Sequence, residues 1–265
     1  MDENGQKPGI GHYTLWSGAI LVLLFLAAPV LIIAVISFDD SRILSFPPRT
    51  TSLRWYEKVA GDPAWRQSLW TSLRVALMTT VLATTAGFFA SLALIRANFK
   101  RKMVIYGFIL TPMIIPNVIV AIAFYMAFAR MGASGSLVAM AIGHAVLALP
   151  LTTIILTASL QGLDERYERA ALSLGASQWQ TMRMVTLPLA VPGLVSAALF
   201  AFLTSFDELL ISLFLAGVQS QTLTVRIWNS LSLEVDPTIT AVSSLLIALT
   251  VAILVVNALF QKRAD

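Results

Sequence analysis

Residues 161–188 read QGLDERYERAALSLGASQWQTMRMVTLP, a polar stretch that separates two long apolar runs. Asp164 is typical of a helix N-cap, and Gly175 suits the left-handed position just beyond the end of a helix. Ser177 and Gln180 have the spacing of a capping box, which opens a helix. The stretch therefore predicts two short helices that meet at a tight joint.

One face of the first of these helices is apolar and shallow. Tyr167, Ala170, Ala171 and Leu174 follow one another at positions i, i+3, i+4 and i+7, so they share a face. The two alanines let another surface approach closely. This face either docks on a separate protein or packs on the chain's own helices, and the spacing leaves both open.

The rest of the chain is strongly apolar. Of its 265 residues, 57% are hydrophobic and 12% are charged, whereas a soluble domain has about 25% charged residues. This composition excludes a disordered chain and an ordinary water-soluble enzyme, and it indicates a polytopic membrane protein. The absence of cysteine excludes disulfides and a thiol nucleophile.

Six apolar runs predict six transmembrane helices and an all-α fold. Each run is long enough to cross about 30 Å of hydrocarbon, where a helix satisfies its own backbone hydrogen bonds. The runs are 15–38, 69–95, 104–129, 137–160, 191–215 and 239–260. We expect an N-terminal tail, one span and an external segment in 1–68, a transmembrane domain in 69–260 with its loop at 161–190, and a tail at 261–265.

Positive charges in the short loops predict the orientation of the spans. Residues 96–102 carry four basic residues and no acid, whereas residues 130–136 carry one basic residue. We therefore expect both termini and the 161–188 stretch to face the cytoplasm. The external segment at 39–68 is then either an interfacial helix that seals the outer rim or a docking surface for an external partner.

Two adjacent carboxylates, Asp207 and Glu208, lie deep in the fifth run. Charged groups at membrane depth are costly and usually face a cavity or an opposite charge. Asp207 either lines the route of a cationic solute or forms a structural pair, for which Arg74 and Arg226 are candidates. Because adjacent residues lie about 100° apart around a helix, we expect only one of the two carboxylates to face the pathway.

Three further residues are candidates for the solute pathway. Pro112 and Pro116 should kink the third run, with Asn117 near the carbonyl groups that the kink frees. Tyr125 and Trp228 are candidates to enclose an ammonium group by cation–π contact.

Motifs for catalysis and cofactor binding are absent from the sequence. It contains no G-x-x-x-x-G-K-[ST], no H-E-x-x-H and no G-x-S-x-G. His144 has no companion at metal-ligand spacing, so we expect a hydrogen-bonded packing residue. The longest basic cluster, residues 100–102, is too short for a nucleic-acid interface. We expect a chain that is not an enzyme and holds no cofactor or metal of its own.

The 161–188 stretch resembles the EAA loop of ATP-binding-cassette importer permeases. The shared pattern is Ala-Ala, three residues, Gly, nine residues, an aliphatic residue, one residue and Leu-Pro. In this chain it consists of Ala170–Ala171, Gly175, Val185 and Leu187–Pro188. We expect Pro188 to end the second short helix. Arg169 stands where the family usually has Glu, with Glu168 one residue earlier.

This resemblance implies a type I importer fold and a function that depends on other subunits. The loop would be the coupling helix that sits in a groove of a separate ATPase dimer, which binds ATP and magnesium. Other implied partners are a second permease subunit in a heterodimer, an external solute-binding protein, a small-molecule solute and the lipid of a bacterial inner membrane. The coupling residues carried over are Tyr167, Glu168, Ala170, Ala171, Leu174, Gly175 and Ala176.

A second pattern is similar to the spermidine/putrescine permease subunits of that family. It consists of SFDELLISLFL at 205–215, TLTVRIW at 222–228, and ISFDD at 36–40 with SLRWY at 52–56. The resemblance implies uptake of a polyamine or a similar small organic cation. An amino-acid derivative or an opine-like solute is the alternative. A further alternative for the function is a self-sufficient secondary transporter, which would show an inverted repeat.

Overall fold

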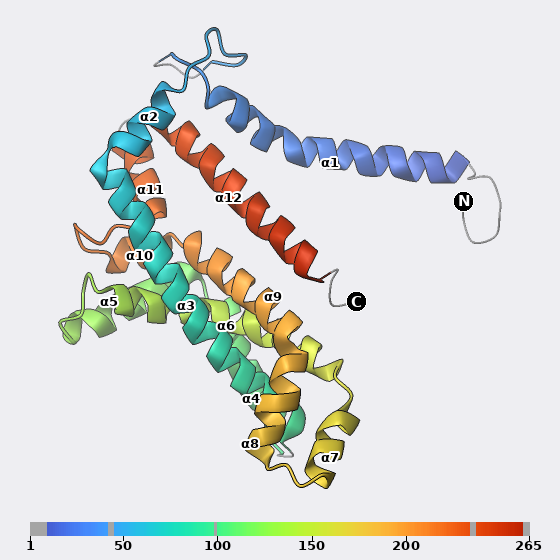
Figure 1. Ribbon diagram of the computed structural model, residues 1–265. Helices are drawn as coiled ribbons and strands as arrows, with labels where there is room; N and C mark the ends of the chain where they lie inside the picture. Colours follow the sequence, from blue (N-terminus) through green and yellow to red (C-terminus); the bar gives the residue numbers. More distant parts are fainter. Residues whose placement is uncertain (1–9, 42–44, 98–99, 234–236, 262–265) are drawn as a thin grey trace. The chain divides into compact units, whose positions relative to one another are not determined.

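A computed structural model describes residues 10–41, 45–97, 100–233 and 237–261 (Figure 1). Apart from an isolated bridge between Asp39 and Thr51, these residues form helices, turns and loops, which confirms the all-α prediction. The helices are α1 (Ile10–Ile36), α2 (Arg54–Gly61), α3 (Pro63–Arg96), α4 (Lys102–Leu110), η1 (Thr111–Met113), α5 (Asn117–Arg130), α6 (Leu137–Gln161), α7 (Glu165–Ser173), α8 (Gln178–Thr181), η2 (Met182–Thr186), α9 (Leu187–Phe206), α10 (Leu210–Leu215), α11 (Leu223–Leu233) and α12 (Thr238–Gln261).

The chain divides into two compact units, one of Met1–Asp62 with Ser230–Leu249 and one of Pro63–Asn229 with Thr250–Asp265. In the first unit, the segment after α1 is organised around the carboxylate of Asp39. The hydroxyl of Ser41 donates to it at 2.6 Å and that of Ser45 at 2.9 Å. These donors, with Ser41 contributing most, lower the pKa of Asp39 to about 2. Trp55 of α2 donates its Nε1–H to the Asp39 carbonyl at 2.7 Å, which ties α2 to this segment.

Helices α3, α6 and α9 form the core of the second unit (Figure 1). Three buried alanines, Ala83, Ala148 and Ala201, lie together where these helices meet. A Cβ at Gly87 of α3 would lie 2.7 Å from the hydroxyl of Thr152 on α6, so only glycine permits this approach. In a membrane, where helix association gains little from the hydrophobic effect, such close contact between small residues provides the packing energy.

Hydroxyl groups add hydrogen bonds between α3 and α6. Each is donated by a buried Ser or Thr to a backbone carbonyl of the other helix. The bonds are Thr79 Oγ1 to Ala141 O at 3.2 Å, Ser91 Oγ to Thr153 O at 3.0 Å and Thr152 Oγ1 to Ala83 O at 3.2 Å. The hydroxyl of Thr152 also lies 2.9 Å from the carbonyl of Leu149 on its own helix. The bonds of Thr79 and Ser91 therefore contribute most to the register of the two helices.

Length and composition identify four or five membrane-spanning segments among the described residues. Four described helical segments are long and apolar enough to cross a membrane: Thr14–Ile36, Pro63–Arg96, Leu137–Gln161 and Gln178–Phe206. The segments Lys102–Met113 and Asn117–Arg130 meet at 95° and raise the count to five if they form one span. The apolar helix Thr238–Ala252 is shorter. The predicted count of six therefore stays a prediction.

The bend in the third run is larger than the expected kink. It lies between Met113 and Asn117, at the segment that contains Pro116, with Pro112 inside η1. Proline removes a backbone donor and disfavours helix in the residue before it. Together the two prolines end one helix and start another. The fourth run differs, because α6 continues through Pro150 as one helix.

The fifth run, predicted at 191–215, has different ends in the structure. Helix runs continuously from Gln178 to Phe206, stops at Asp207, and resumes as α10. The prediction that Pro188 ends the second short helix is wrong. The π-helical turn η2 precedes Pro188, which falls in the first turn of α9. The wider turn and the altered hydrogen bonding accommodate a residue without an N–H.

Candidate functional site

The 161–188 loop has the local structure that its sequence predicts. Asp164 caps α7 by accepting a bond from the backbone N–H of Arg166 at 2.9 Å. Gly175 has φ +89°, a left-handed value that favours glycine. Ser177 and Gln180 form both bonds of the capping box, at 3.3 and 2.7 Å. The first short helix, the joint and the start of the second helix are therefore confirmed, whereas the second helix continues into α9 instead of ending at Pro188.

The apolar face of α7 is turned away from the rest of its unit. Tyr167 is 61% exposed and Leu174, just beyond α7, is 89% exposed. Ala170 and Gly175 are also exposed, and Ala171 and Ala176 are half-buried. A Cβ at Gly175 would meet nothing within 4 Å. The exposed face favours docking on a separate protein over packing on the chain's own helices.

The opposite side of α7 is bound to two spans. Arg96, the last residue of α3, provides the first connection. Its Nη1 donates to Glu165 at 2.8 Å and its Nη2 to Glu168 at 3.2 Å. Thr186 of η2 donates its hydroxyl to the same Glu168 carboxylate at 2.9 Å. We call Arg96, Glu168 and Thr186 the clasp. It joins the ends of α3 and of the α8–α9 helix to α7.

Sequence reasoning missed the clasp and used Arg96 only as an orienting charge. The bond between Arg96 and Glu168 spans 72 residues, so no local pattern reveals it. The only signal was a basic residue at the end of a span. The side chains of Arg96 and Glu168 are 20% and 19% exposed, so this pair is better shielded from water than the pair of Arg169 and Glu165, at 72% and 52%.

Asp207 and Glu208 lie where the fifth run breaks. Asp207 caps the C-terminal end of α9 and is exposed. Glu208 is half-buried and accepts a bond from the backbone N–H of Ile211 at 2.8 Å, at the start of α10. Within the described residues, no ion pair joins either carboxylate to Arg74 or Arg226. The guanidinium of Arg226 instead stacks over the Trp65 ring at 4.9 Å.

The other predicted pathway residues are not brought into one group. Asn117 is the first residue of α5 and is exposed. Tyr125 is 45% exposed and its ring lies 6.5 Å from that of Phe214 on α10. Trp228 lies on α11 and is 47% exposed. The described residues show no ring contact between Tyr125 and Trp228, and the aromatic box stays a prediction.

His144 on α6 is fully buried and bridges the break in the fifth run. Its Nδ1 lies 2.8 Å from the hydroxyl of Ser205, near the end of α9, and its Nε2 lies 3.0 Å from that of Ser212 on α10. Ser205 donates onward to Thr79 at 3.1 Å. This direction requires Ser205 to accept from Nδ1–H, which leaves Nε2 to accept from Ser212. The expectation of a hydrogen-bonded packing residue is confirmed.

Replacement of His144 by alanine should destabilise the protein. The change leaves the hydroxyls of Ser205 and Ser212 without their shared partner, and a buried unsatisfied group costs about 1 to 3 kcal/mol. We expect the free energy of unfolding in detergent to fall by that amount. His12→Ala, on exposed α1, is the matched control and should change it by less than about 0.5 kcal/mol. Equal stability of the two variants would contradict a structural role for the bridge.

Comparison with known proteins identifies relatives over most of the chain. The family model described as "Binding-protein-dependent transport system inner membrane component" matches residues 83–265. The spermidine/putrescine transport system permease protein PotC of Haemophilus influenzae is 30% identical over 244 residues, which cover 92% of this chain and 94% of that protein. The putrescine transport system permease protein PotI of Escherichia coli strain K12 is 28% identical over 241 residues, covering 88% and 85%.

A solved structure shares the fold. A chain of a bacterial ABC transporter involved in the import of the acidic polysaccharide alginate matches with a TM-score of 0.69 and 17% identity. The match covers 97% of this chain and 99% of that one.

Proposed function

The chain belongs to the family of binding-protein-dependent transport system inner membrane components, and from this membership we propose that it is the permease subunit of an ATP-driven importer. The family consists of membrane components, and the fold matches a chain of an importer. ATP and magnesium are assigned to a separate ATPase dimer. An external binding protein delivers the solute, and a second permease subunit completes a heterodimer.

The proposed solute is a polyamine or a similar small organic cation. The observation that carries this proposal is the similarity to PotC and PotI over most of the chain, since both names specify polyamine transport. Uptake of radiolabelled putrescine and spermidine should be lost when the chain is deleted and restored when it is re-expressed. Uptake that is unaffected by deletion, or that is inhibited only by amino-acid derivatives, would contradict the assignment.

We propose that the exposed face of α7 and its joint insert into a groove of the ATPase. Tyr167, Ala170 and Leu174 provide the contact surface, and Gly175 leaves room for close approach. Ala171 and Ala176 line its edge. Glu168 belongs to the clasp instead, so its proposed role is to hold α7 on the spans through Arg96 and Thr186. Movement of the ATPase then reaches α3 and α9 through one rigid connection.

Both termini and α7 are assigned to the cytoplasm on the distribution of basic residues. The transmembrane domain is assigned to residues 69–260, somewhat longer at its start than the family match. The segment before it contributes α1 and the external stretch around Asp39 and α2.

Asp207 is the proposed attraction point for a cationic solute, because it is exposed at a break in a span. Removal of the charge in Asp207→Asn should weaken solute capture. A unit charge about 4 Å from a cation contributes roughly 1 kcal/mol even at the dielectric of water, so we expect uptake at low concentration to fall about fivefold or more. Uptake kinetics identical to those of the unmodified chain would remove Asp207 from the pathway.

A further inference from the structure

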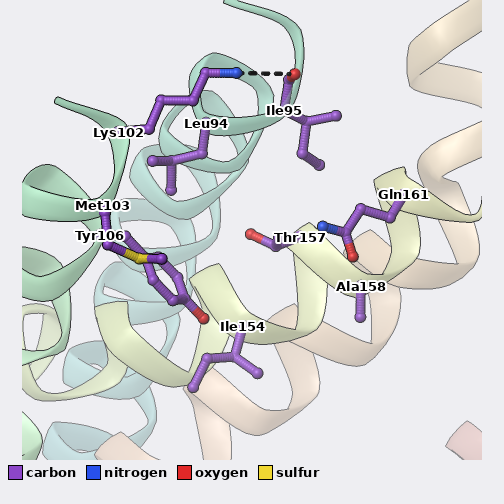
Figure 2. Close-up of a pocket in the computed structure, with 9 residues that line it drawn as sticks. All are labelled: Leu94, Ile95, Lys102, Met103, Tyr106, Ile154, Thr157, Ala158 and Gln161. Carbon is purple, nitrogen blue, oxygen red and sulfur yellow. Dashed lines mark hydrogen bonds between the residues drawn. The ribbon is translucent and has the colours of Figure 1, made fainter. Parts of the chain in front are cut away.

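An open pocket of about 630 Å³ lies between the ends of α3, α4 and α6 (Figure 2). Its walls combine two kinds of side chain. Leu94, Met103 and Ile154 provide apolar surface. The hydroxyls of Tyr106 and Thr157 and the amide of Gln161 point toward the middle of the pocket, as Figure 2 shows. Such a combination suits a ligand with one apolar and one polar part.

The charged side chain at the rim of the pocket is positive. Lys102 lies along its rim, where its Nζ donates to the Ile95 carbonyl at 3.4 Å. None of the residues that line the pocket is acidic. The sequence between Arg96 and Lys102 also contains Lys100 and Arg101 and no acid. Lys102 on the rim, with Lys100 and Arg101 directly before it in the sequence, makes this end of α4 basic, and a basic segment favours an anion.

Helix α4 carries several exposed apolar side chains. Met103, which lines the pocket, is 80% exposed. Val104 and Phe108 are 69% and 79% exposed and lie about 160° around the helix from the pocket-lining Tyr106. In this chain, a run of exposed apolar side chains on a helix that follows a basic loop marks the boundary between head groups and acyl chains. Apolar surface below a basic rim is the arrangement by which pockets between transmembrane helices hold anionic lipid.

We propose that this pocket binds the head group of an anionic phospholipid, with its phosphate near Lys102 and its acyl chains against the apolar wall of Leu94, Met103 and Ile154. The hydroxyl of Tyr106 and the amide of Gln161 supply hydrogen-bond donors at the level of the phosphate, whereas the Thr157 hydroxyl donates to Ser91 at 3.1 Å. A free phosphate ion would use the same donors but would gain nothing from this apolar wall. The apolar wall therefore favours a lipid over a soluble anion.

Native mass spectrometry of the full chain, purified with its accompanying subunits, tests the proposal. The protein is placed in nanodiscs of equal parts phosphatidylglycerol and phosphatidylcholine, and the lipids it retains on release are counted. We expect retained phosphatidylglycerol in the unmodified chain and about fivefold weaker retention in Lys102→Gln. Lys100→Gln removes the same charge outside the pocket and should have a smaller effect. Equal effects of both variants would show diffuse attraction and overturn the proposal.

A second variant tests the pocket without altering its charge. Ala158 lines the pocket and is exposed, so Ala158→Trp should fill it and displace the retained lipid. A correct elution volume in size-exclusion chromatography shows that the variant is folded. Retention that persists in Ala158→Trp would overturn the proposal, as would displacement of the lipid by millimolar inorganic phosphate.

A benzophenone amino acid at position 106 identifies the occupant directly. A covalent adduct with the mass of phosphatidylglycerol is the expected result. An adduct with another protein subunit would assign the pocket to a protein interface instead.

Discussion

Gly175→Trp should abolish the stimulation of ATP hydrolysis by the solute-loaded binding protein while membrane insertion continues. A Cβ at this position meets no neighbour within the chain, so the indole would extend into the space assigned to the ATPase groove. Coupling between two sites in an allosteric protein is typically worth a factor of about 5 to 150. We expect this entire factor to disappear, measured as the ratio of stimulated to basal ATP hydrolysis in proteoliposomes.

Gly175→Ala is the matched control for this experiment. Gly175 has φ +89°, and any L-residue there is strained, by about 1 to 2 kcal/mol in the left-handed region. The alanine variant carries that strain without the bulk of the indole. It should retain most of the stimulation, and equal loss in both variants would trace the effect to the backbone of the joint rather than to the ATPase contact.

Arg96→Gln should uncouple ATP hydrolysis from transport by releasing α7 from the spans. The substitution removes the cation that holds Glu165 and Glu168, and hydrogen bonds to charged groups are worth about 1.5 to 3 kcal/mol each. We expect amide hydrogen exchange in α7 to accelerate by about tenfold or more, as loss of at least 1.4 kcal/mol of local stability requires. Solute molecules transported per ATP should fall at the same time.

Arg169→Gln provides the comparison for the clasp. It makes the same chemical change on α7 and removes a bond to the same Glu165, at 3.2 Å. That pair is exposed, and exposed ion pairs contribute about 0 to 1 kcal/mol. Hydrogen exchange in α7 should therefore change by less than about fivefold. Similar acceleration in both variants would show that the clasp has no special role.

The parts of this chain that sequence reasoning predicted correctly are governed by neighbouring residues. The cap at Asp164, the left-handed turn at Gly175 and the capping box at Ser177 each depend on side chains within three residues. A change of direction at Pro112 and Pro116 depends on the covalent geometry of proline, although the 95° bend is larger than the predicted kink. Such features follow from local chemistry, so one sequence is enough to predict them.

Features that depend on tertiary contact were missed or predicted wrongly. The clasp joins residues that are far apart in sequence, and its partners carry no local pattern. The prediction that the helix ends at Pro188 did not account for the π-helical turn before it. That turn changes the backbone hydrogen bonding, so the helix tolerates a residue that has no N–H. The aromatic box of Tyr125 and Trp228 is not among these and stays a prediction, because it depends on the placement of two distant helices around a solute.

The proposed coupling requires the exposed face of α7 to contact a separate ATPase subunit. The chain has no cysteine, so Leu174→Cys creates a single attachment point in this chain, which is labelled with a thiol-reactive benzophenone before it is assembled with the other subunits. After illumination, we predict a cross-link to the ATPase that depends on the cysteine. A cross-link found only within this chain, with the ATPase present and active, would contradict the account.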